Sequence, residues 1–257
     1  MKAVIGAEFD ATFETMFLAN RDIQHYLTLG ENVGIAFYEA LALIDGDINA
    51  DGFMDLYVGN DFIEPDFLYI NQGDGTFVDS IDAYFPHMSN NTMGADAGDV
   101  NNDGRLDFMS LDMLPETHYR QKTLMTSMRY DRYKQLEKYN YGRQLMRNTL
   151  FVQGTDQKMR DIGCFAGIDA TDWSWSPLMA DFDGDGWKDI FISNGYRRDL
   201  TDLDFMMYYD ENVGRTALPE DNVEKLLAQV PIQPVANYMY QNQGDYTFKS
   251  RAKDWGL

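Results

Sequence analysis

Three copies of one nine-residue acidic loop constrain the fold of this chain more than any other feature. The copies span residues 47–55, 99–107 and 181–189, and each follows the pattern D-x-[DN]-x-D-G-x-x-D. Alternate positions carry oxygen-bearing side chains, the Gly at position six permits a sharp turn, and the final Asp can close a ligand shell. Three copies in 257 residues predict a repeat architecture.

The pattern predicts a Ca²⁺ site in each loop, and therefore about three ions in the chain. The expected ligands are the side chains at positions 1, 3, 5 and 9 and the backbone carbonyl at position 7. They are Asp47, Asn49, Asp51, Phe53 and Asp55 in loop one, Asp99, Asn101, Asp103, Arg105 and Asp107 in loop two, and Asp181, Asp183, Asp185, Trp187 and Asp189 in loop three. The alternative is ordinary Asx and Gly turn chemistry without metal. We expect loop three, which has Asp instead of Asn at position 3, to bind most tightly.

The flanking residues exclude an EF-hand. Position 12, where an EF-hand needs Glu, is Val58, Ser110 or Ile192, and the residues after each loop read as a strand. Each loop is therefore predicted to be the tip of a β-hairpin. A second motif, 67–77, recurs at 238–248 and more weakly at 148–154, and predicts a further strand–turn–strand. Four antiparallel strands in each unit predict a β-propeller blade.

At these residues the chain resembles the FG-GAP or VCBS repeat proteins, whose blades also build the integrin α-subunit head. It is most similar to bacterial secreted or surface proteins that are often joined to an ASPIC/UnbV domain. The resemblance covers about residues 30–257 and is carried by the three loops and by residues 57–62, 93–96, 112–116, 172–175 and 194–199. It implies a propeller, usually of seven blades, with Ca²⁺ in hairpin loops and no agreed chemical activity.

The expected fold is all-β: a single partial propeller over residues 1–257, with about three to four blades and a poorly matched segment 1–36. This blade number predicts that the chain is a fragment of a larger chain or surface assembly. From Asp47 to Gly73 is 26 positions, whereas the equivalent spans are 55 in unit two and 63 in unit three. The spacing places insertions at about 112–147 and 199–236, at the end of each blade opposite its loop.

Both insertions have helical patterns, the second one with a helix running from Pro219 to Pro231. Residues 116–148 hold eight bases and three acids, whereas residues 199–230 hold eight acids and two bases. We therefore expect the two insertions to lie on one face and to pair electrostatically. The rival interpretation is that the basic insertion binds an anionic polysaccharide or an acidic partner.

Composition limits the function classes. A formal net charge of −21 argues against nucleic acid and anionic membranes as partners. No apolar run is long enough for a membrane span, and the short apolar start, followed by Glu8, is not expected to act as a signal peptide. Three scattered His make a zinc site improbable, and the single Cys164 is expected to be buried. Weak Ca²⁺ loops suit calcium-rich surroundings, so we expect an extracellular, periplasmic or outer-surface location.

The favoured function is a calcium-stabilised binding or scaffold module for a glycan or protein partner on the insertion face. The alternative is a polysaccharide-degrading lyase or hydrolase, and a purely architectural role is a third possibility. The sequence assigns no catalytic residue and favours a non-enzymatic role, because it has no G-x-S-x-G, H-E-x-x-H or Walker motif. Asp61 and Asp112 are the available acid pair, although structural hydrogen bonds are expected of them. Trp173 and Trp175 would either fill the core or form a ligand platform. The same choice holds for Tyr130, Tyr133, Tyr139, Tyr141, Tyr208 and Tyr209, with core packing expected for most.

Overall fold

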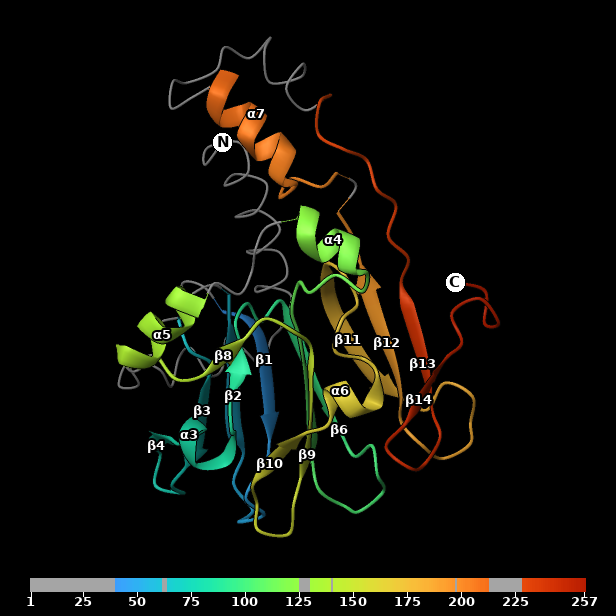
Figure 1. Cartoon of the computed structure of the whole chain (residues 1–257). Helices are drawn as coiled ribbons and strands as arrows, with labels where there is room; N and C mark the ends of the chain where they lie inside the picture. The colour runs from blue at the N-terminus through green and yellow to red at the C-terminus, as the bar shows by residue number, and fades with distance from the viewer. Residues whose placement is uncertain (1–39, 62–63, 125–129, 140, 197, 213–227) are drawn as a thin grey trace. The chain divides into compact units, whose positions relative to one another are not determined.

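The computed structural model describes residues 40–61, 64–124, 130–139, 141–196, 198–212 and 228–257 (Figure 1). The poorly matched segment 1–36 and residues 219–227 of the helix expected before Pro231 lie outside the described residues. Residues 228–230 are not helical, so the described end of that predicted helix is wrong.

The described strands form three four-stranded antiparallel sheets, and each sheet follows the chain from its first strand to its last. Sheet one contains β1 (Ala40–Gly46), β2 (Asp55–Asn60), β3 (Phe67–Asn71) and β4 (Phe77–Asp79). Sheet two contains β6 (Gly94–Gly98), β7 (Asp107–Leu111), β9 (Thr149–Gln153) and β10 (Met159–Asp161). Sheet three contains β11 (Ser174–Ala180), β12 (Asp189–Asn194), β13 (Tyr238–Asn242) and β14 (Phe248–Ser250). The predicted four-stranded unit is confirmed in all three copies.

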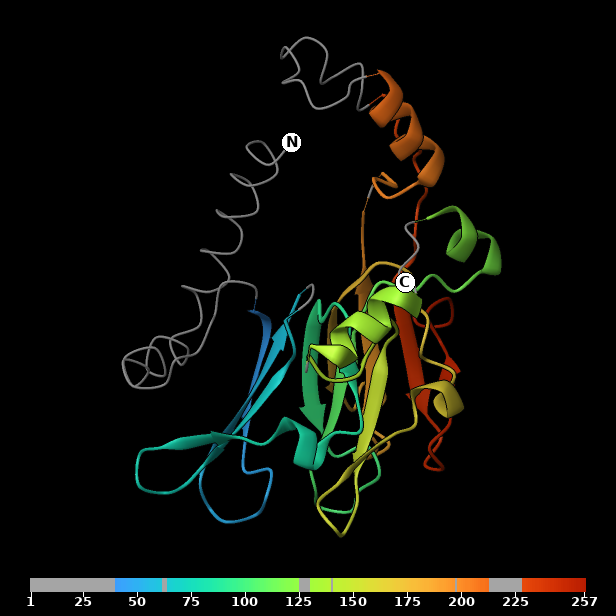
Figure 2. The same ribbon diagram turned by 60° about the vertical axis from the view of Figure 1, so that its left-hand side comes forward.

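The sheets stand side by side in chain order, and their first strands lie closest together (Figure 2). Strand β6 contacts both β1 and β11. The first strands are therefore innermost, as they are in the blades of a propeller, and we call the three sheets blades one, two and three. The predicted all-β, propeller-like fold is confirmed.

Both faces of blade two are buried, because successive side chains point to opposite sides of the sheet. Phe108 and Phe151 point into a core shared with blade one, whereas Met109 and Leu150 point into a core shared with blade three. Successive residues of a strand face opposite sides, so both sets must be apolar. This explains why the strands after the loops read as continuous apolar runs rather than as alternating ones.

Small residues allow the inner strands to approach one another. A Cβ added at Gly94 in β6 would lie 2.1 Å from the carbonyl oxygen of Trp175 in β11. No side chain fits at that distance, so a residue larger than Gly would push blades two and three apart.

The helices lie in the connections between the strands. The first insertion contains α4 (His118–Thr123), α5 (Tyr130–Lys138) and strand β8 (Gln144–Leu145), and the second contains α7 (Leu203–Asn212). Strand β8 pairs in parallel with β5 (Met88–Ser89), which follows the short helix α3 (Ile81–Tyr84); α6 (Gly163–Ala166) follows β10. Helices α4 and α7 lie beyond the ends of the sheets opposite the three acidic loops (Figure 1). None of the described helices is long and apolar enough to cross a membrane.

Candidate metal centres

All three acidic loops are hairpin tips that join the first two strands of a blade. The residues that flank each loop are paired partners, for example Gly46 with Asp55 and Gly98 with Asp107. The Gly at position six has a φ of 91° at Gly52, 84° at Gly104 and 93° at Gly186. Only Gly adopts this left-handed region at low cost, so the motif fixes the tight turn.

The first Asp of each loop organises the turn. In loop one, Asp47 Oδ1 accepts a hydrogen bond from the backbone N–H of Asp51 at 3.0 Å, and Asp47 Oδ2 accepts one from Gly52 at 2.9 Å. Asp99 and Asp181 accept the equivalent pairs in loops two and three, with donor–acceptor distances of 2.8–3.1 Å. The three loops therefore share one conformation, and their first carboxylates are held in place by backbone donors.

The last Asp of each loop is buried and ties the loop to its blade. Asp55, Asp107 and Asp189 are at most 1% exposed. In each blade one carboxylate oxygen accepts the N–H of loop position 2, and the other accepts the N–H of the residue that ends the third strand. Burial raises the pKa of the Asp107 carboxyl to about 6 and also raises the pKa of Asp55 and of Asp189. A nearby cation stabilises the charged form of a carboxylate that is buried in this way.

Loop three brings its acids closest together. Carboxylate oxygens of Asp181, Asp183 and Asp189 all lie within 4.8 Å of one another, the only such group of three among the residues that the structure describes. An all-oxygen donor set of this kind suits a hard cation. In loops one and two the amide of Asn49 or Asn101 replaces the carboxylate at position 3. In loop two, Asp103 also forms an ion pair with Arg105.

The side chain at loop position 7 has a packing role that the loop pattern does not reveal. The ring of Phe53 lies over Gly73, and the ring of Trp187 lies over Gly244. In blade two, Arg105 instead donates from Nε to the carbonyl of Gln153 at 3.0 Å. Each loop therefore packs against the outer hairpin turn of its own blade.

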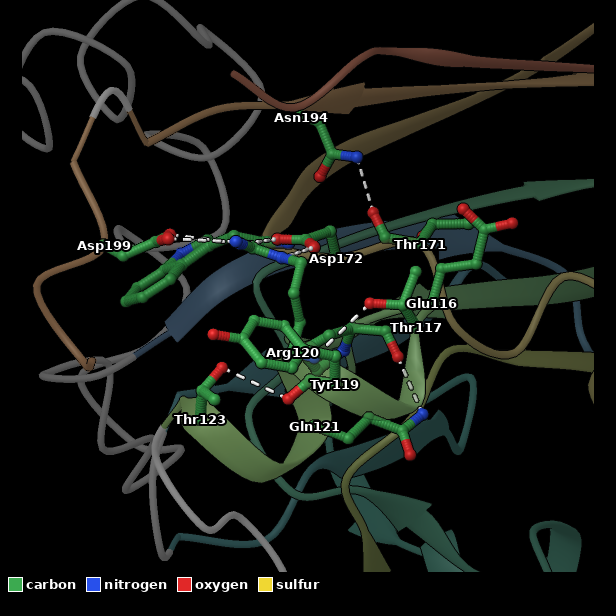
Figure 3. A network of polar contacts seen from close by, with 12 residues as sticks. Glu116, Thr117, Tyr119, Arg120, Gln121, Thr123, Thr171, Asp172, Asn194 and Asp199 are labelled. Atoms are coloured by element: carbon green, nitrogen blue, oxygen red, sulfur yellow. Dashed lines mark hydrogen bonds and ion pairs between the residues drawn. The ribbon is translucent and has the colours of Figure 1, made fainter. Parts of the chain in front are cut away.

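The predicted pairing of the insertions occurs through Arg120, which lies between two aspartates (Figure 3). The guanidinium of Arg120 in α4 donates to both oxygens of Asp172, at 2.6 and 2.9 Å, and to both oxygens of Asp199, at 2.9 and 3.0 Å. Hydrogen bonding to Asp172 and Asp199 raises the pKa of Arg120. The first insertion is thus joined to the start of the second and to the segment that leads into β11.

Buried acids between blades one and two are held by neutral donors. Asp112 Oδ2 accepts from the Ser89 hydroxyl at 2.5 Å and from the backbone of Asn90 at 2.9 Å, and Asp61 accepts from the Asn91 side chain at 2.9 Å. The structural role predicted for Asp61 and Asp112 is therefore confirmed. The loop and repeat patterns give no sign of a third acid, Asp66, whose pKa is raised by burial to about 7. Its position after Pro65, at the start of a strand, resembles an ordinary turn residue.

The two candidate tryptophans are half-buried and share one neighbour. Tyr196 lies 4.5 Å from Trp173 and 5.9 Å from Trp175 between ring centroids. The expectation that most of the insertion tyrosines pack in the core is wrong. Tyr130, Tyr139 and Tyr208 are 71%, 67% and 44% exposed, and the other three are only partly buried. Cys164 is also exposed rather than buried, because it lies on the outer side of the short helix α6.

A cavity of about 280 Å³ lies where the first insertion folds back against the connection between blades one and two. Its polar lining is Asp82, His87, Glu137 and Arg143, and Phe85, Pro86 and Met88 supply apolar walls. His87 reaches out of the cavity lining to Asp161, with 3.1 Å between Nε2 and Oδ2.

Comparison with known proteins gives one match. Residues 47–110 match the FG-GAP-like repeat family, a span that begins at the first Asp of loop one and ends within β7. The matched repeat therefore includes two of the three acidic loops and the outer hairpin between them. No curated protein matches the chain.

Proposed function

The chain carries an FG-GAP-like repeat, and on that premise we propose that it is a calcium-stabilised, propeller-type module that binds a glycan or a protein outside the cytoplasm. FG-GAP-like repeats are typical of extracellular and cell-surface proteins. Free Ca²⁺ is abundant there, which suits sites with a Kd on the order of 10⁻⁴–10⁻³ M.

The observation that carries the calcium proposal is the convergence of acids in loop three. Three carboxylates within 4.8 Å of one another repel strongly unless a cation lies between them. Backbone donors hold the first Asp in the same way in all three loops. The shared conformation therefore extends the proposal of a cation site from loop three to loops one and two. On this basis Asp181, Asp183 and Asp189 would hold the ion of loop three.

The insertion end of the blades is our candidate for partner binding. The exposed rings of Tyr119, Tyr130 and Tyr139 belong to the basic first insertion, and the cavity beside α5, where that insertion folds back, adds polar groups of both signs. Aromatic faces next to hydrogen-bonding groups suit sugars and protein side chains alike.

A polysaccharide-degrading enzyme remains the second candidate, favoured by the two acids, Asp82 and Glu137, that line the cavity. A general acid needs a raised pKa. A hydrogen bond from Lys134 instead lowers the pKa of Glu137. Glu137 would therefore be ionised at neutral pH, which suits binding better than proton donation.

Three experiments test the proposed function. Calorimetric titration with CaCl₂ should give about three sites, and an Asp181→Asn variant should lose one of them. A titration without heat, together with a Tm that Ca²⁺ does not change, would exclude the calcium role. A glycan array probed with the full chain, with and without Ca²⁺, should give ligands that a Tyr130→Ala/Tyr139→Ala variant loses. Release of reducing or unsaturated sugar from a bound glycan, abolished by Glu137→Gln, would establish the enzyme instead.

A further inference from the structure

Buried hydrogen bonds connect the three acidic loops to one another. In loop one, the N–H of Ile48 donates to Asp55 Oδ2 at 2.9 Å. The carbonyl of the same residue accepts a bond of 2.7 Å from the side-chain amide of Gln153, which lies in blade two and 105 positions away in the chain. Two hydrogen bonds, both through the peptide groups of Ile48, therefore link the last Asp of loop one to the neighbouring blade.

The same arrangement continues from loop two to loop three. The backbone N–H of Gln153 donates to Asp107 Oδ1, and Asp107 Oδ2 accepts from Val100. The carbonyl of Val100 accepts a bond of 2.8 Å from the side-chain amide of Asn242 in blade three, whose backbone N–H donates to Asp189 Oδ1. Gln153 and Asn242 thus have equivalent roles: each joins the last Asp of its own loop to the loop before it.

Burial makes these bonds specific. Gln153 and Asn242 are each 3% exposed, and the carbonyl-bearing residues Ile48 and Val100 are 2% and 3% exposed. Water cannot replace a lost partner at such positions, and hydrogen bonds in a low-dielectric interior strengthen one another. A second contact between loops two and three, from Asn102 to the carbonyl of Gly186, is exposed and can exchange with solvent.

We propose that Gln153 and Asn242 are positioning residues that couple the cation sites, so that filling one loop raises the affinity of the next. This inference rests on the proposed calcium function. A cation fixes the final Asp of its loop, and that Asp holds both the N–H of position 2 and the end of the third strand. Through the amide on the third strand, the order gained in one loop is passed to the adjacent loop. Coupling of this kind is reciprocal and is typically about 5–150-fold in affinity.

Loop three offers a site-specific readout, because it alone has Trp at position 7, where loops one and two have Phe53 and Arg105. Terbium luminescence excited through Trp187 therefore reports the affinity of loop three for Tb³⁺. In the native chain, Asp99→Asn in loop two should weaken Tb³⁺ binding at loop three about fivefold or more. In an Asn242→Leu background the same change should have no effect.

Two controls separate coupling from general disturbance. Gln243→Met removes an exposed amide that donates within its own blade, and Asn102→Ala removes the exposed contact between loops; both should keep the native response. Gln153→Met should abolish the effect of Asp47→Asn on loop three while preserving the effect of Asp99→Asn. The Gln153→Met variant therefore tests the coupling even if Asn242→Leu does not fold.

The outcomes are distinct. The coupling is overturned if Asp99→Asn leaves loop three unchanged in the native chain, or if it weakens loop three equally in the Asn242→Leu background, which would indicate direct electrostatics. Absence of Trp187-sensitised luminescence from the folded native chain would instead overturn the cation site itself, and with it the proposed function.

Discussion

The two ends of the blades hold their acidic residues in different ways. At the loop end, which carries residues 47–55, 99–107 and 181–189, the carboxylates are held mainly by backbone N–H groups. The side chains that also donate to them are Asn49 to Asp51, Arg105 to Asp103 and Gln241 to Asp183. At the insertion end, where segments 112–147 and 199–236 leave the sheets, buried acids are matched by Arg120 or by hydroxyl and amide donors. The loop end should therefore respond to cations, and the insertion end to pH and to loss of Arg120.

Removal of calcium should have the largest effect and should act at the loop end. At about 10 mM Ca²⁺ and a Kd of roughly 0.1–1 mM, each site contributes about 1.4–2.7 kcal/mol, or about 4–8 kcal/mol for three sites. We expect excess EDTA to lower the Tm by about 10 °C or more. Differential scanning calorimetry measures the shift, and an unchanged Tm would mean that the loops are metal-free turns.

Loss of Arg120 should have the next largest effect and should leave the loop end intact. The Arg120→Met variant strands Asp172 and Asp199, whose side chains are 9% and 11% exposed, and should cost about 3–5 kcal/mol of unfolding free energy. Urea unfolding measures the loss.

The matched control is Arg160→Met, because Arg160 pairs with Asp156 on the surface, where the two side chains are 57% and 50% exposed. It should change stability little, because water and salt screen an ion pair on the surface. Equal losses in the two variants would show that Arg120 is an ordinary surface charge.

The buried Asp66 should make the insertion end less stable as pH rises. In the unfolded chain an Asp ionises near pH 3.9, whereas burial raises the pKa of Asp66 to about 7. Its contribution to stability is therefore complete below about pH 4 and is lost as pH rises towards 7. The native chain and the Asp66→Asn variant are unfolded with urea in the presence of EDTA at a series of pH values. Over this pH range the free energy of unfolding of the native chain should fall by about 2–4 kcal/mol more than that of the variant. Parallel pH profiles would contradict this.

The smallest expected effect distinguishes loop three from its sister loops. Asp183→Asn reproduces the position-3 amide of loops one and two and removes one of the three gathered carboxylates. We expect a several-fold loss of Tb³⁺ affinity at loop three, measured by Trp187-sensitised luminescence, because affinity follows the number of ligand charges. An unchanged affinity would show that charge does not rank the three loops.

Local sequence was a good guide wherever one segment determined the structure. The residue type at position 12 was enough to exclude EF-hands, and the strand patterns after each loop predicted hairpins that the structure confirms. The opposite charges of the insertions predicted a contact that Arg120 and Asp199 make. The exposure of Cys164 cannot be read from the sequence, because a four-residue helix leaves no periodic signal.

Contacts between distant segments could not be predicted. The bonds from Gln153 to loop one and from Asn242 to loop two span 105 and 142 positions. The two amides differ in length, and in sequence both resemble polar residues at the end of a strand. Only their placement against the preceding blade gives them a role. In the same way Asp66 resembles a turn residue in the sequence, and only the fold brings the hydroxyls of Tyr57 and Thr92 to its carboxylate.

By itself, the sequence determined the acidic loops, their hairpin geometry and the four-stranded repeat, because a fixed order of Asp, Asn and Gly limits the backbone over nine residues. Tertiary structure decided which acids are buried and which loops are connected. Those properties depend on the packing of one blade against the next, where a single amide meets a carbonyl more than a hundred residues away. The motif specifies each candidate cation site, whereas the arrangement of the blades makes the three sites one connected system.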